Sequence, residues 1–353
     1  MNPTRIIKVD PLKISEDYIL KAVDILKSGG LVILPTETVY GIAADALNKE
    51  AVERLAEIKK RPKDKPFTLA IDSKEKVEEF CREIPLAAYK LMDKFWPGPL
   101  TLVLKGVSQP TIGLRLPDNA VALKIISLLG NPVVLPSANL SGGPSPENFA
   151  AAIQGLDGLV DLAIDSGDLE LGVESTVVDL TAQIPRVIRS GAINAEEINK
   201  AISRKNILFV CTGNTCRSVI AEGLFRKMMR EQKRDDVEVS SAGITALAGM
   251  GASQAAREAL AREGIDVSAH LARAVTSRAL KRSDLILVME KAHEAAVLQV
   301  APEVKNRVFL LKEFAKIDDS NLDIIDPMGR PLDFYEQTFA SIREALERVS
   351  KLI

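Results

Sequence analysis

The segment of residues 211–218 constrains the fold of this 353-residue chain more than any other part of the sequence. It follows an apolar run at residues 207–210 and precedes a segment with helical periodicity at residues 219–230. A strand that runs through a short polar turn into a helix directs the turn amides and the positive end of the helix toward an anion. We therefore expect an anion-binding turn at the carboxyl end of a strand in an α/β fold.

The residue types in this turn suit phosphoryl transfer to sulfur. Cys211 would face the helix N-terminus and the Arg217 guanidinium, and both stabilise a thiolate. The guanidinium is a planar fork that binds two phosphoryl oxygens at once. The other phosphate-loop residues predicted here are Thr212, Gly213, Asn214, Thr215, Cys216 and Ser218. Gly213 and Asn214 allow a left-handed backbone, and the Ser218 hydroxyl is expected to bond the sulfur.

This turn resembles the phosphate-binding loop of the low-molecular-weight protein phosphatase family, in which a Cys is followed by five residues and then by Arg and Ser. The resemblance extends over residues 205–353 and includes a late Asp-Pro pair at residues 326–327. It implies that Cys211 is the nucleophile, that Arg217 binds the phosphoryl group and that Asp326 is the general acid. The chain departs from the family at Val219, where Pro is usual, and at Met328, where an aromatic residue usually lines the pocket.

Thr215 bears on the choice of substrate. Family members directed at tyrosine generally carry Ile there, whereas members that resemble protein-arginine phosphatases carry Thr, whose hydroxyl can position the attacking water. The resemblance therefore favours a phosphoarginine protein substrate, with phosphotyrosine as the alternative. Arsenate reduction would need a further cysteine pair, and no Cys follows Cys216. Cys216 would either form a reversible disulfide with Cys211 under oxidation or be a buried, unreactive thiol.

The length of the chain predicts two domains, because ordinary domains contain about 100–200 residues. We expect the boundary near Arg204, between a first domain of residues 1–204 and a second of residues 205–353. Hydrophobic residues make up 46% and charged residues 27% of the sequence, which is typical of a globular protein. No apolar run approaches the roughly 20 residues of a membrane span and no signal-peptide core is visible, so we expect a cytoplasmic protein without a membrane partner.

Cysteine, histidine and net charge argue against several classes of function. Three cysteines, two of them in one turn, cannot form a disulfide framework. The two histidines, His270 and His293, are far apart in sequence, so no protein-held metal site is expected. A formal net charge of −2 argues against a broadly basic nucleic-acid-binding face, although residues 59–65 form one basic run.

Apolar strands alternate with helical stretches along both halves, which predicts the α/β class throughout. In the first half the expected helices are residues 15–28, 48–60 and 85–95, and the expected strands are residues 31–34, 67–71, 100–104, 111–116 and 132–135. In the second half, helices separate the strands expected at residues 207–210, 237–240, 285–289 and 308–310. Strands spaced in this way form a doubly wound parallel sheet.

Several strands of the first half end in turns rich in hydroxyl and amide groups, at residues 35–41, 136–139 and 174–176. Each of these turns, taken alone, is an ordinary turn or helix cap. Their recurrence with basic residues at 59–62, Arg115 and Arg189 indicates that they converge on one anionic, hydroxyl-bearing ligand, for which a nucleotide is the obvious candidate. No Walker sequence or dinucleotide fingerprint is present, so side chains would have to hold the phosphates.

These segments, together with the Trp-Pro-Gly-Pro sequence at residues 96–99, resemble the YrdC-like threonylcarbamoyl-AMP synthase family over residues 15–201. The resemblance implies a twisted-sheet α/β domain that makes a carbamate from L-threonine and bicarbonate or CO2. The carbamate then attacks the α-phosphate of ATP and releases pyrophosphate, and Mg²⁺ accompanies the ATP. The product would pass to downstream tRNA-modification proteins, which use it to modify the adenosine beside the anticodon.

By this resemblance, two sets of side chains form the first site. The residues expected to bind threonine are Thr36, Thr38, Arg115, Ser137 and Ser175. The residues expected to bind ATP are Lys59, Arg61, Lys65, Thr111, Asn139, Ser145 and Arg189. The chain departs from the family pattern at Ala70, where many relatives have His, and at Glu147, where a Ser or Thr is usual and a carboxylate would repel phosphate.

The sequence therefore predicts a bifunctional fusion of a synthase and a phosphatase, and it leaves three alternatives to weigh. The first domain could be an RNA-binding module that has lost catalysis, which the net charge argues against. It could belong to the similar carbamoyl-transfer proteins that mature hydrogenases, but three cysteines cannot supply their zinc modules. The second domain could only dock phosphorylated partners, but Cys211, Arg217 and Asp326 are all present.

Overall fold

A computed structural model describes the whole chain except residues 1–2, 11–12, 63–64 and 141. The chain divides into two compact units, Met1–Ile202 and Ser203–Ile353. This division falls close to Arg204, where the sequence analysis places the boundary. Each unit has its own sheet and its own clusters of buried apolar side chains.

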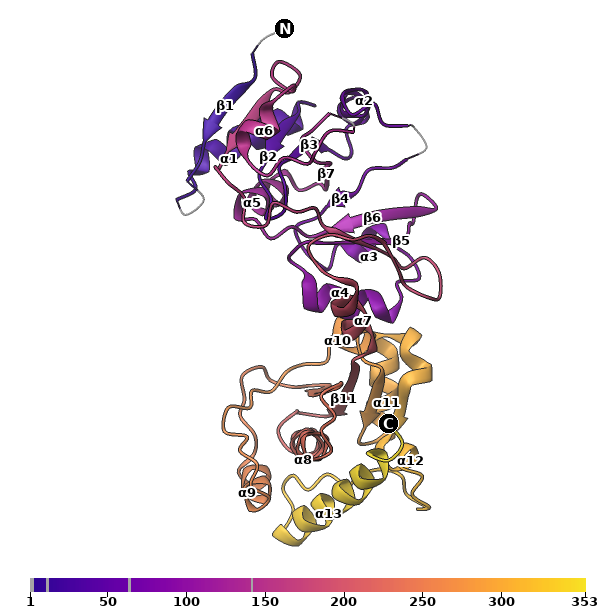
Figure 1. Ribbon diagram of the computed structural model, residues 1–353. Coiled ribbons are helices and arrows are strands. Elements are labelled where there is room, and N and C mark those ends of the chain that lie inside the picture. The colour runs from indigo at the N-terminus through magenta and orange to yellow at the C-terminus, as the bar shows by residue number, and fades with distance from the viewer. Residues whose placement is uncertain (1–2, 11–12, 63–64, 141) are drawn as a thin grey trace. The chain divides into compact units, whose positions relative to one another are not determined.

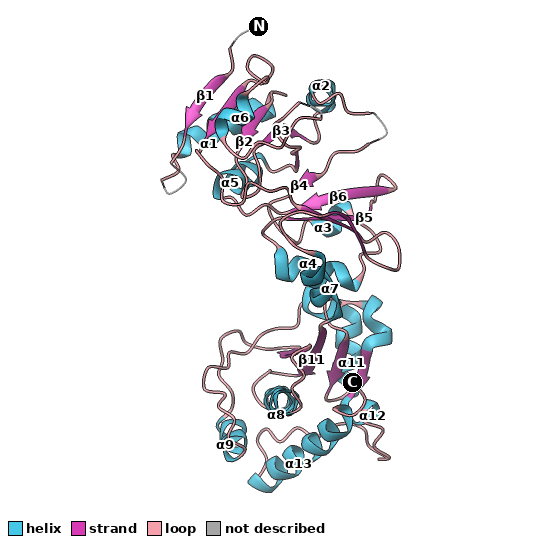
Figure 2. Ribbon diagram, in the orientation of Figure 1, coloured by secondary structure: helices cyan, strands magenta, loops and turns pink. Residues whose placement is uncertain are grey.

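In the first unit, the described residues form a ten-stranded mixed sheet (Figures 1 and 2). Its strands are β1 (Arg5–Lys8), β2 (Val32–Leu34), β3 (Gly41–Asp45), β4 (Leu69–Ala70), β5 (Leu100–Lys105), β6 (Thr111–Arg115), β7 (Val133–Val134), β8 (Leu162–Asp165), β9 (Thr176–Asp179) and β10 (Arg186–Arg189). They lie in the order β1-β8-β2-β3-β7-β4-β6-β5-β9-β10. The pairs β2–β8 and β5–β9 are parallel, whereas β2–β3 and β5–β6 are antiparallel.

Helices cover the sheet of the first unit on both faces. They are α1 (Glu16–Lys27), α2 (Lys49–Ile58), α3 (Val77–Phe80), α4 (Leu86–Phe95), α5 (Ala120–Leu129), α6 (Phe149–Ile153) and α7 (Ala195–Ser203). Successive side chains of a strand point to opposite faces. In β2, Val32 and Leu34 therefore pack in one cluster with α1 and α5, while Ile33 packs in another with α2 and α6.

The second unit is built on a parallel sheet in the order β12-β11-β13-β14. Its strands are β11 (Lys205–Cys211), β12 (Val237–Gly243), β13 (Leu285–Val288) and β14 (Val308–Leu310). Its helices are α8 (Arg217–Glu231), α9 (Gln254–Arg262), α10 (Ser277–Lys281), α11 (Lys291–Val300), the 3-10 helix η1 (Pro302–Arg307), α12 (Leu311–Phe314) and α13 (Leu332–Val349). Phe209 packs with α8 and α13, and its neighbours Leu208 and Val210 pack with α10 and α11. Helices on both faces of a parallel sheet confirm the predicted doubly wound fold.

Two strands of the first unit are shorter than the sequence predicts. β4 contains only Leu69–Ala70 and β7 only Val133–Val134, against the expected residues 67–71 and 132–135. Pro132 and Pro136 bracket β7, and proline has no amide hydrogen to donate to a neighbouring strand. Both short strands are followed by loops, so the sheet is narrow at these two strands.

Candidate active sites

A cavity of about 440 Å³ in the first unit is lined by residues from the polar strand ends and from the loop after α2. The sequence-predicted residues that line it are Lys59, Arg61, Lys65, Arg115, Ser137, Asn139, Ser175 and Arg189. Segments more than a hundred residues apart in the chain thus meet at one place, and five of these side chains are lysines or arginines. Such a lining suits an anionic ligand.

Lys59, at the end of α2, ties the basic loop to the turn that follows β7. Its ammonium group donates to the Ser137 carbonyl at 2.8 Å, to the Asn139 carbonyl at 2.5 Å and to Asn139 Oδ1 at 2.8 Å. Burial, with a smaller contribution from the nearby Arg61 charge, lowers the pKa of Lys59 to about 8. The Lys59 charge therefore depends on pH near neutrality.

Arg61 organises the loop between α2 and β4. Its Nε donates to the Lys65 carbonyl at 2.8 Å and its Nη2 donates to the Pro66 carbonyl at 2.6 Å. Its guanidinium also lies 4.6 Å from the centre of the Phe67 ring, within the range of a cation–π interaction. Arg61 and Lys65 both line the cavity, while residues 63–64 lie outside the described residues.

Arg115, at the end of β6, is held by the turn after β2. Its Nη2 donates to Thr38 Oγ1 at 2.7 Å and lies 2.8 Å from Glu37 Oε1. Thr36 Oγ1 lies 2.8 Å from Thr38 Oγ1 and donates to the Val39 carbonyl. Thr36 and Thr38 are buried and do not line the cavity among the described residues, so they position Arg115 from behind. Oε2 of the buried Glu37 carboxylate has no hydrogen-bond partner within the described part of the chain.

Arg189, at the end of β10, closes the other side of the cavity. Its Nη2 donates to Ser175 Oγ and its Nη1 pairs with Glu174 Oε2, both at 2.9 Å. Ser175 Oγ also lies 2.9 Å from Thr101 Oγ1 on β5. Ser145 is not a lining residue in the described structure, but its hydroxyl donates to Glu174 Oε1 at 2.5 Å and so supports the same side.

Three positions singled out in the sequence lie apart from the cavity lining. Thr111 is exposed at the start of β6, on the same strand face as Arg115 but not beside it. Ala70 is buried in the apolar cluster with α1 and α5. Glu147 is exposed and does not line the cavity, so its carboxylate does not oppose an anion there.

In the second unit, β11 ends at Cys211 and α8 begins at Arg217, so the predicted turn joins a strand to a helix. Cys211 Sγ lies 2.9 Å from Ser218 Oγ and accepts a hydrogen bond from the Asn214 amide at 3.3 Å. The Thr215 side chain is buried, and its carbonyl accepts from the Ser253 amide at 2.8 Å. The Asn214 amide and the Ser218 hydroxyl thus hold the sulfur at the loop.

The left-handed residue of this loop is Asn214, with φ of 53°, and Gly213 does not have a positive φ. Both residue types permit a left-handed backbone, and the loop adopts it at Asn214 and not at Gly213. The glycine that the loop requires is Gly243, at the end of β12. A Cβ atom there would lie 2.6 Å from the Thr212 carbonyl oxygen and 2.7 Å from the Asn214 nitrogen.

The Asn214 side chain holds the strained turn in place. Its Nδ2 donates to Ser218 Oγ at 3.0 Å and to Ser241 Oγ at 2.7 Å, and its Oδ1 accepts from the Arg273 amide at 2.9 Å. His270 Nε2 lies 2.8 Å from the Asn214 carbonyl oxygen. A left-handed non-glycine residue costs about 1–3 kcal/mol, so these bonds are needed to keep it there.

The Arg217 guanidinium is almost completely buried and brings the predicted general acid to the loop. It forms ion pairs with Asp326 and Glu290, and it donates to the Ile324 carbonyl at 3.0 Å and to Thr212 Oγ1 at 3.2 Å. Asp326 thus reaches the loop from a segment far along the chain. These four contacts use the N–H groups of Nη1 and Nη2, so within the described structure only Nε–H of the five guanidinium donors is without a partner.

Several residues around this loop escaped the sequence analysis. Glu290 pairs with Arg217, His293 Nε2 lies 2.9 Å from Thr212 Oγ1, and Ser241 bonds Asn214. Burial, and then the Arg217 charge, lowers the pKa of His293 and favours its neutral form. These side chains come from segments with no local motif, so the sequence offered no signal for them. Burial raises the pKa of the Cys216 thiol to about 12.

The pocket wall beyond Asp326 also differs from what the resemblance implies. Met328, at the position where an aromatic residue is usual, is 60% exposed, and its amide donates to Asp326 Oδ1 at 3.0 Å. Tyr335, near the start of α13, is partly buried, and burial raises its pKa, with smaller contributions from Cys216 and Asp326. An aromatic ring therefore lies close to the loop, although not at position 328.

Two family models match the chain, one in each unit. The Sua5/YciO/YrdC model, described as telomere recombination, matches residues 24–191. The model for low molecular weight phosphotyrosine protein phosphatases matches residues 206–353.

Individual relatives agree with the first match. A threonylcarbamoyl-AMP synthase of Pyrococcus abyssi is 41% identical over 221 residues, which cover 60% of this chain and 65% of the relative, so the chain spans about two thirds of that protein. A candidate threonylcarbamoyl-AMP synthase of Mycobacterium tuberculosis is 37% identical over 193 residues, 52% of this chain and 88% of the relative. The crystal structure of P. abyssi Sua5 complexed with L-threonine has a TM-score of 0.55 at 27% identity, covering 98% of each chain.

Proposed function

Because the chain belongs to the threonylcarbamoyl-AMP synthase family through its first unit and carries a low-molecular-weight phosphotyrosine protein phosphatase domain in its second, we propose that it is a bifunctional enzyme. The first unit makes L-threonylcarbamoyladenylate from L-threonine, bicarbonate or CO2, and ATP. The second unit hydrolyses phosphorylated protein side chains through a phosphocysteine. We place both reactions in the cytoplasm; among the described residues, no helix has the length and apolar character to cross a bilayer.

The synthase proposal rests on the convergence of Lys59, Arg61, Arg115 and Arg189 with strand-end hydroxyls on one cavity. The amino group of threonine adds to CO2 to give a carbamate, and a carbamate oxygen attacks the α-phosphorus as pyrophosphate leaves. No enzyme nucleophile is required, because fixed positive charges offset the charge on the leaving pyrophosphate. Holding the carbamate in line with phosphorus supplies up to about 7–11 kcal/mol of the barrier reduction.

We assign the residue roles in the synthase from the charge of each lining side chain and from the family resemblance. Arg115, positioned by Thr38, takes the threonine carboxylate, with Ser137 and Ser175 beside it. Lys59, Arg61, Lys65 and Arg189 take the triphosphate, which brings Mg²⁺ with it. The product then passes to proteins that modify tRNA.

Pyrophosphate release tests this half of the proposal. Purified full-length chain with Mg·ATP should release pyrophosphate only when both L-threonine and bicarbonate are present. Arg61→Gln should lower kcat/KM for ATP, and Cys211→Ser should leave the rate unchanged because it lies in the other unit. Pyrophosphate release that does not need threonine would contradict the proposal.

The phosphatase proposal rests on the Cys211 sulfur, which accepts from the Asn214 amide in the turn before α8, and on the ion pair that joins Arg217 to Asp326. The thiolate attacks phosphorus, the leaving nitrogen or oxygen takes the proton of Asp326, and water then hydrolyses the phosphocysteine to inorganic phosphate. We propose phosphoarginine as the substrate because of Thr215, whose hydroxyl is suited to orient that water. Phosphotyrosine is the alternative.

A substitution at position 215 separates the two substrates. Hydrolysis of phosphoarginine and phosphotyrosine peptides is compared in the wild type and in Thr215→Ile. We expect the ratio of kcat/KM values to move toward phosphotyrosine in the variant. An unchanged ratio would remove the specificity role of Thr215, and hydrolysis that survives Cys211→Ser would remove the nucleophile.

A further inference from the structure

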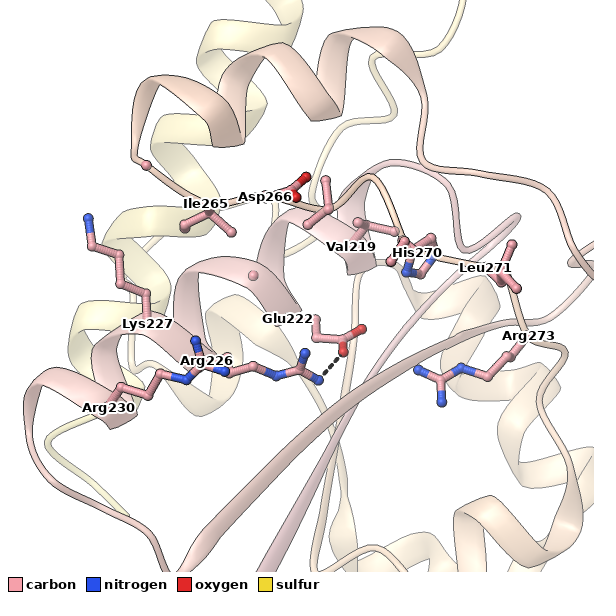
Figure 3. Close-up of a pocket in the computed structure, with 14 residues that line it drawn as sticks. Val219, Glu222, Arg226, Lys227, Arg230, Ile265, Asp266, His270, Leu271 and Arg273 are labelled. Carbon is pink, nitrogen blue, oxygen red and sulfur yellow. Dashed lines mark hydrogen bonds and ion pairs between the residues drawn. The ribbon is translucent and has the colours of Figure 1, made fainter.

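A second cavity, of about 740 Å³, lies in the phosphatase unit, and its described lining includes no residue of the loop at 211–218 (Figure 3). One wall is α8, which carries Arg226, Lys227 and Arg230, and the other wall is the segment of residues 264–273. Figure 3 shows the Arg226 and Arg273 guanidiniums directed toward Glu222 at the base of the cavity. Neither the synthase nor the phosphatase reaction uses this cavity.

The lining of this cavity is cationic. The lining contains two carboxylates, those of Glu222 and Asp266, and four cationic side chains, those of Arg226, Lys227, Arg230 and Arg273. The cavity is thus positively charged although the whole chain has a formal net charge of −2. A neighbouring cavity of about 580 Å³ shares Arg226, Arg230 and Arg273 with it. Within the described residues, the guanidiniums of Arg230 and Arg273 have no ion-pair or hydrogen-bond partner. Two uncompensated guanidiniums on opposite walls are therefore available to a bound anion.

Size and residue type indicate the kind of anion. Guanidinium groups match phosphate oxygens in pairs, and here they outnumber the single lysine. The cavity is partly open to solvent, and its volume falls within the range of about 300–1,000 Å³ that small-molecule sites span. No aromatic ring other than the His270 imidazole lines the described cavity, so there is little surface on which nucleic-acid bases could stack.

The cavity is connected to the phosphatase loop by hydrogen bonds. Arg226 pairs with one oxygen of the buried Glu222 carboxylate, and the other oxygen accepts from Ser241, which in turn accepts from Asn214 Nδ2. Two other lining residues contact Asn214 directly, through His270 Nε2 and the Arg273 amide. A ligand that draws Arg226 from Glu222 would leave that carboxylate without its charge partner. The hydrogen bonds that run from Glu222 through Ser241 to the Asn214 side chain would then be disturbed.

We propose that this cavity is an effector site for an anion that contains a phosphoanhydride, and that binding there lowers the turnover of the phosphatase through Asn214. Pyrophosphate and the diphosphate of a nucleotide share this chemistry. Arg230 and Arg273 would bind the anion first, and Arg226 would join them by leaving Glu222. The effect on turnover rests on the proposed phosphatase function, whereas the binding does not.

Hydrogen–deuterium exchange of the full-length chain tests binding separately from activity. Sodium pyrophosphate, ADP and an RNA oligonucleotide are the probes, and peptides covering residues 219–231 and 264–273 report on the cavity. Peptides covering residues 59–67 and 211–218 report on the two other anion sites. We expect slower exchange in the cavity peptides with pyrophosphate or ADP, and loss of this effect in Arg230→Gln/Arg273→Gln but not in Arg262→Gln, an exposed control on α9.

Turnover supplies the second readout. Pyrophosphate should lower kcat for a phosphorylated peptide at least about fivefold, the lower end of ordinary allosteric coupling, in the wild type but not in the double variant. Competition at the Cys211 loop would instead raise KM equally in both proteins. If both pyrophosphate and ADP leave the cavity peptides unchanged, if the double variant keeps the protection, or if only RNA protects them, the effector site is overturned. Protection without any effect on kcat would overturn the coupling alone.

Discussion

At the scale of single residues, the loop around Cys211 depends on an absent side chain at Gly243 and not at Gly213. A Cβ at position 243 would collide with the loop backbone, whereas one at position 213 would meet only Thr215 Oγ1 at 3.6 Å. We expect Gly243→Ala to lower phosphatase kcat about 100-fold, because displacing a reacting group by about 1 Å has this effect. Gly213→Ala should stay within a few-fold of the wild type, and similar losses in both variants would contradict the structure.

Lys59 makes ATP binding depend on pH. The free enzyme has a Lys59 pKa of about 8, and a bound triphosphate favours the charged form and raises that pKa. The affinity gained from the charge is therefore complete below pH 8 and is lost as pH rises toward the pKa of the complex. We expect the Kd for ATP to increase about fivefold between pH 8 and pH 9, because each proton linkage changes affinity at most tenfold per pH unit.

Calorimetric titration of ATP at pH 7, 8 and 9 measures this dependence. Lys59→Arg is the matched variant, since a guanidinium stays protonated over the whole range. Its Kd should be nearly flat with pH. The same pH dependence in Lys59→Arg would assign the titration to another group.

At the scale of elements, hydroxyl pairs join strand ends into one site. Thr101 on β5 and Ser175 before β9 share a hydrogen bond, and Ser175 also accepts from Arg189. Thr101→Val keeps the shape but leaves Ser175 and Arg189 less fixed, at a cost of about 1 kcal/mol. We expect a several-fold increase in KM for threonine or ATP in the pyrophosphate assay. Thr181→Val is the control. It removes a hydroxyl that donates to Asp179 at the opposite end of β9, and it should leave KM unchanged.

The elements were also the part most accessible from sequence. Alternating apolar strands and helices predicted the four strands of the second sheet and five of the ten described strands of the first, since hydrophobic periodicity follows directly from which face of a strand or helix is buried. Motifs at strand ends predicted Cys211, Arg217 and most of the cavity lining in the first unit. Glu290, His293 and Ser241 could not be predicted, because each reaches its site only through long-range folding. The sequence could not show which of Gly213 and Asn214 has the positive φ, because both Gly and Asn tolerate a left-handed backbone.

At the scale of the whole molecule, each unit has its own core, so damage to one core should leave the other site working. Phe225, fully buried in the second unit, packs edge-on against Phe209 with ring centres 5.7 Å apart. Phe225→Ala should destabilise this unit by about 3–5 kcal/mol. Leu247→Ala, at a position 69% exposed, should change stability by less than about 0.5 kcal/mol.

Scanning calorimetry measures both variants, and added ATP with threonine identifies the transition of the first unit because bound ligands raise it. We expect Phe225→Ala to shift only the other transition and to leave threonine-dependent pyrophosphate release intact at 25 °C. A loss of that release would show that the two units depend on each other.

All three thiols are buried, and the raised pKa values of two of them have a practical consequence. The pKa values of Cys81 and Cys216 are raised to about 12 by burial, so neither presents a thiolate at neutral pH. A reagent that alkylates thiolates should therefore spare both of these sulfurs, and the proposed nucleophile at position 211 would be its target. A single covalent tag per molecule, read by mass, would count competent phosphatase loops directly in a crude extract.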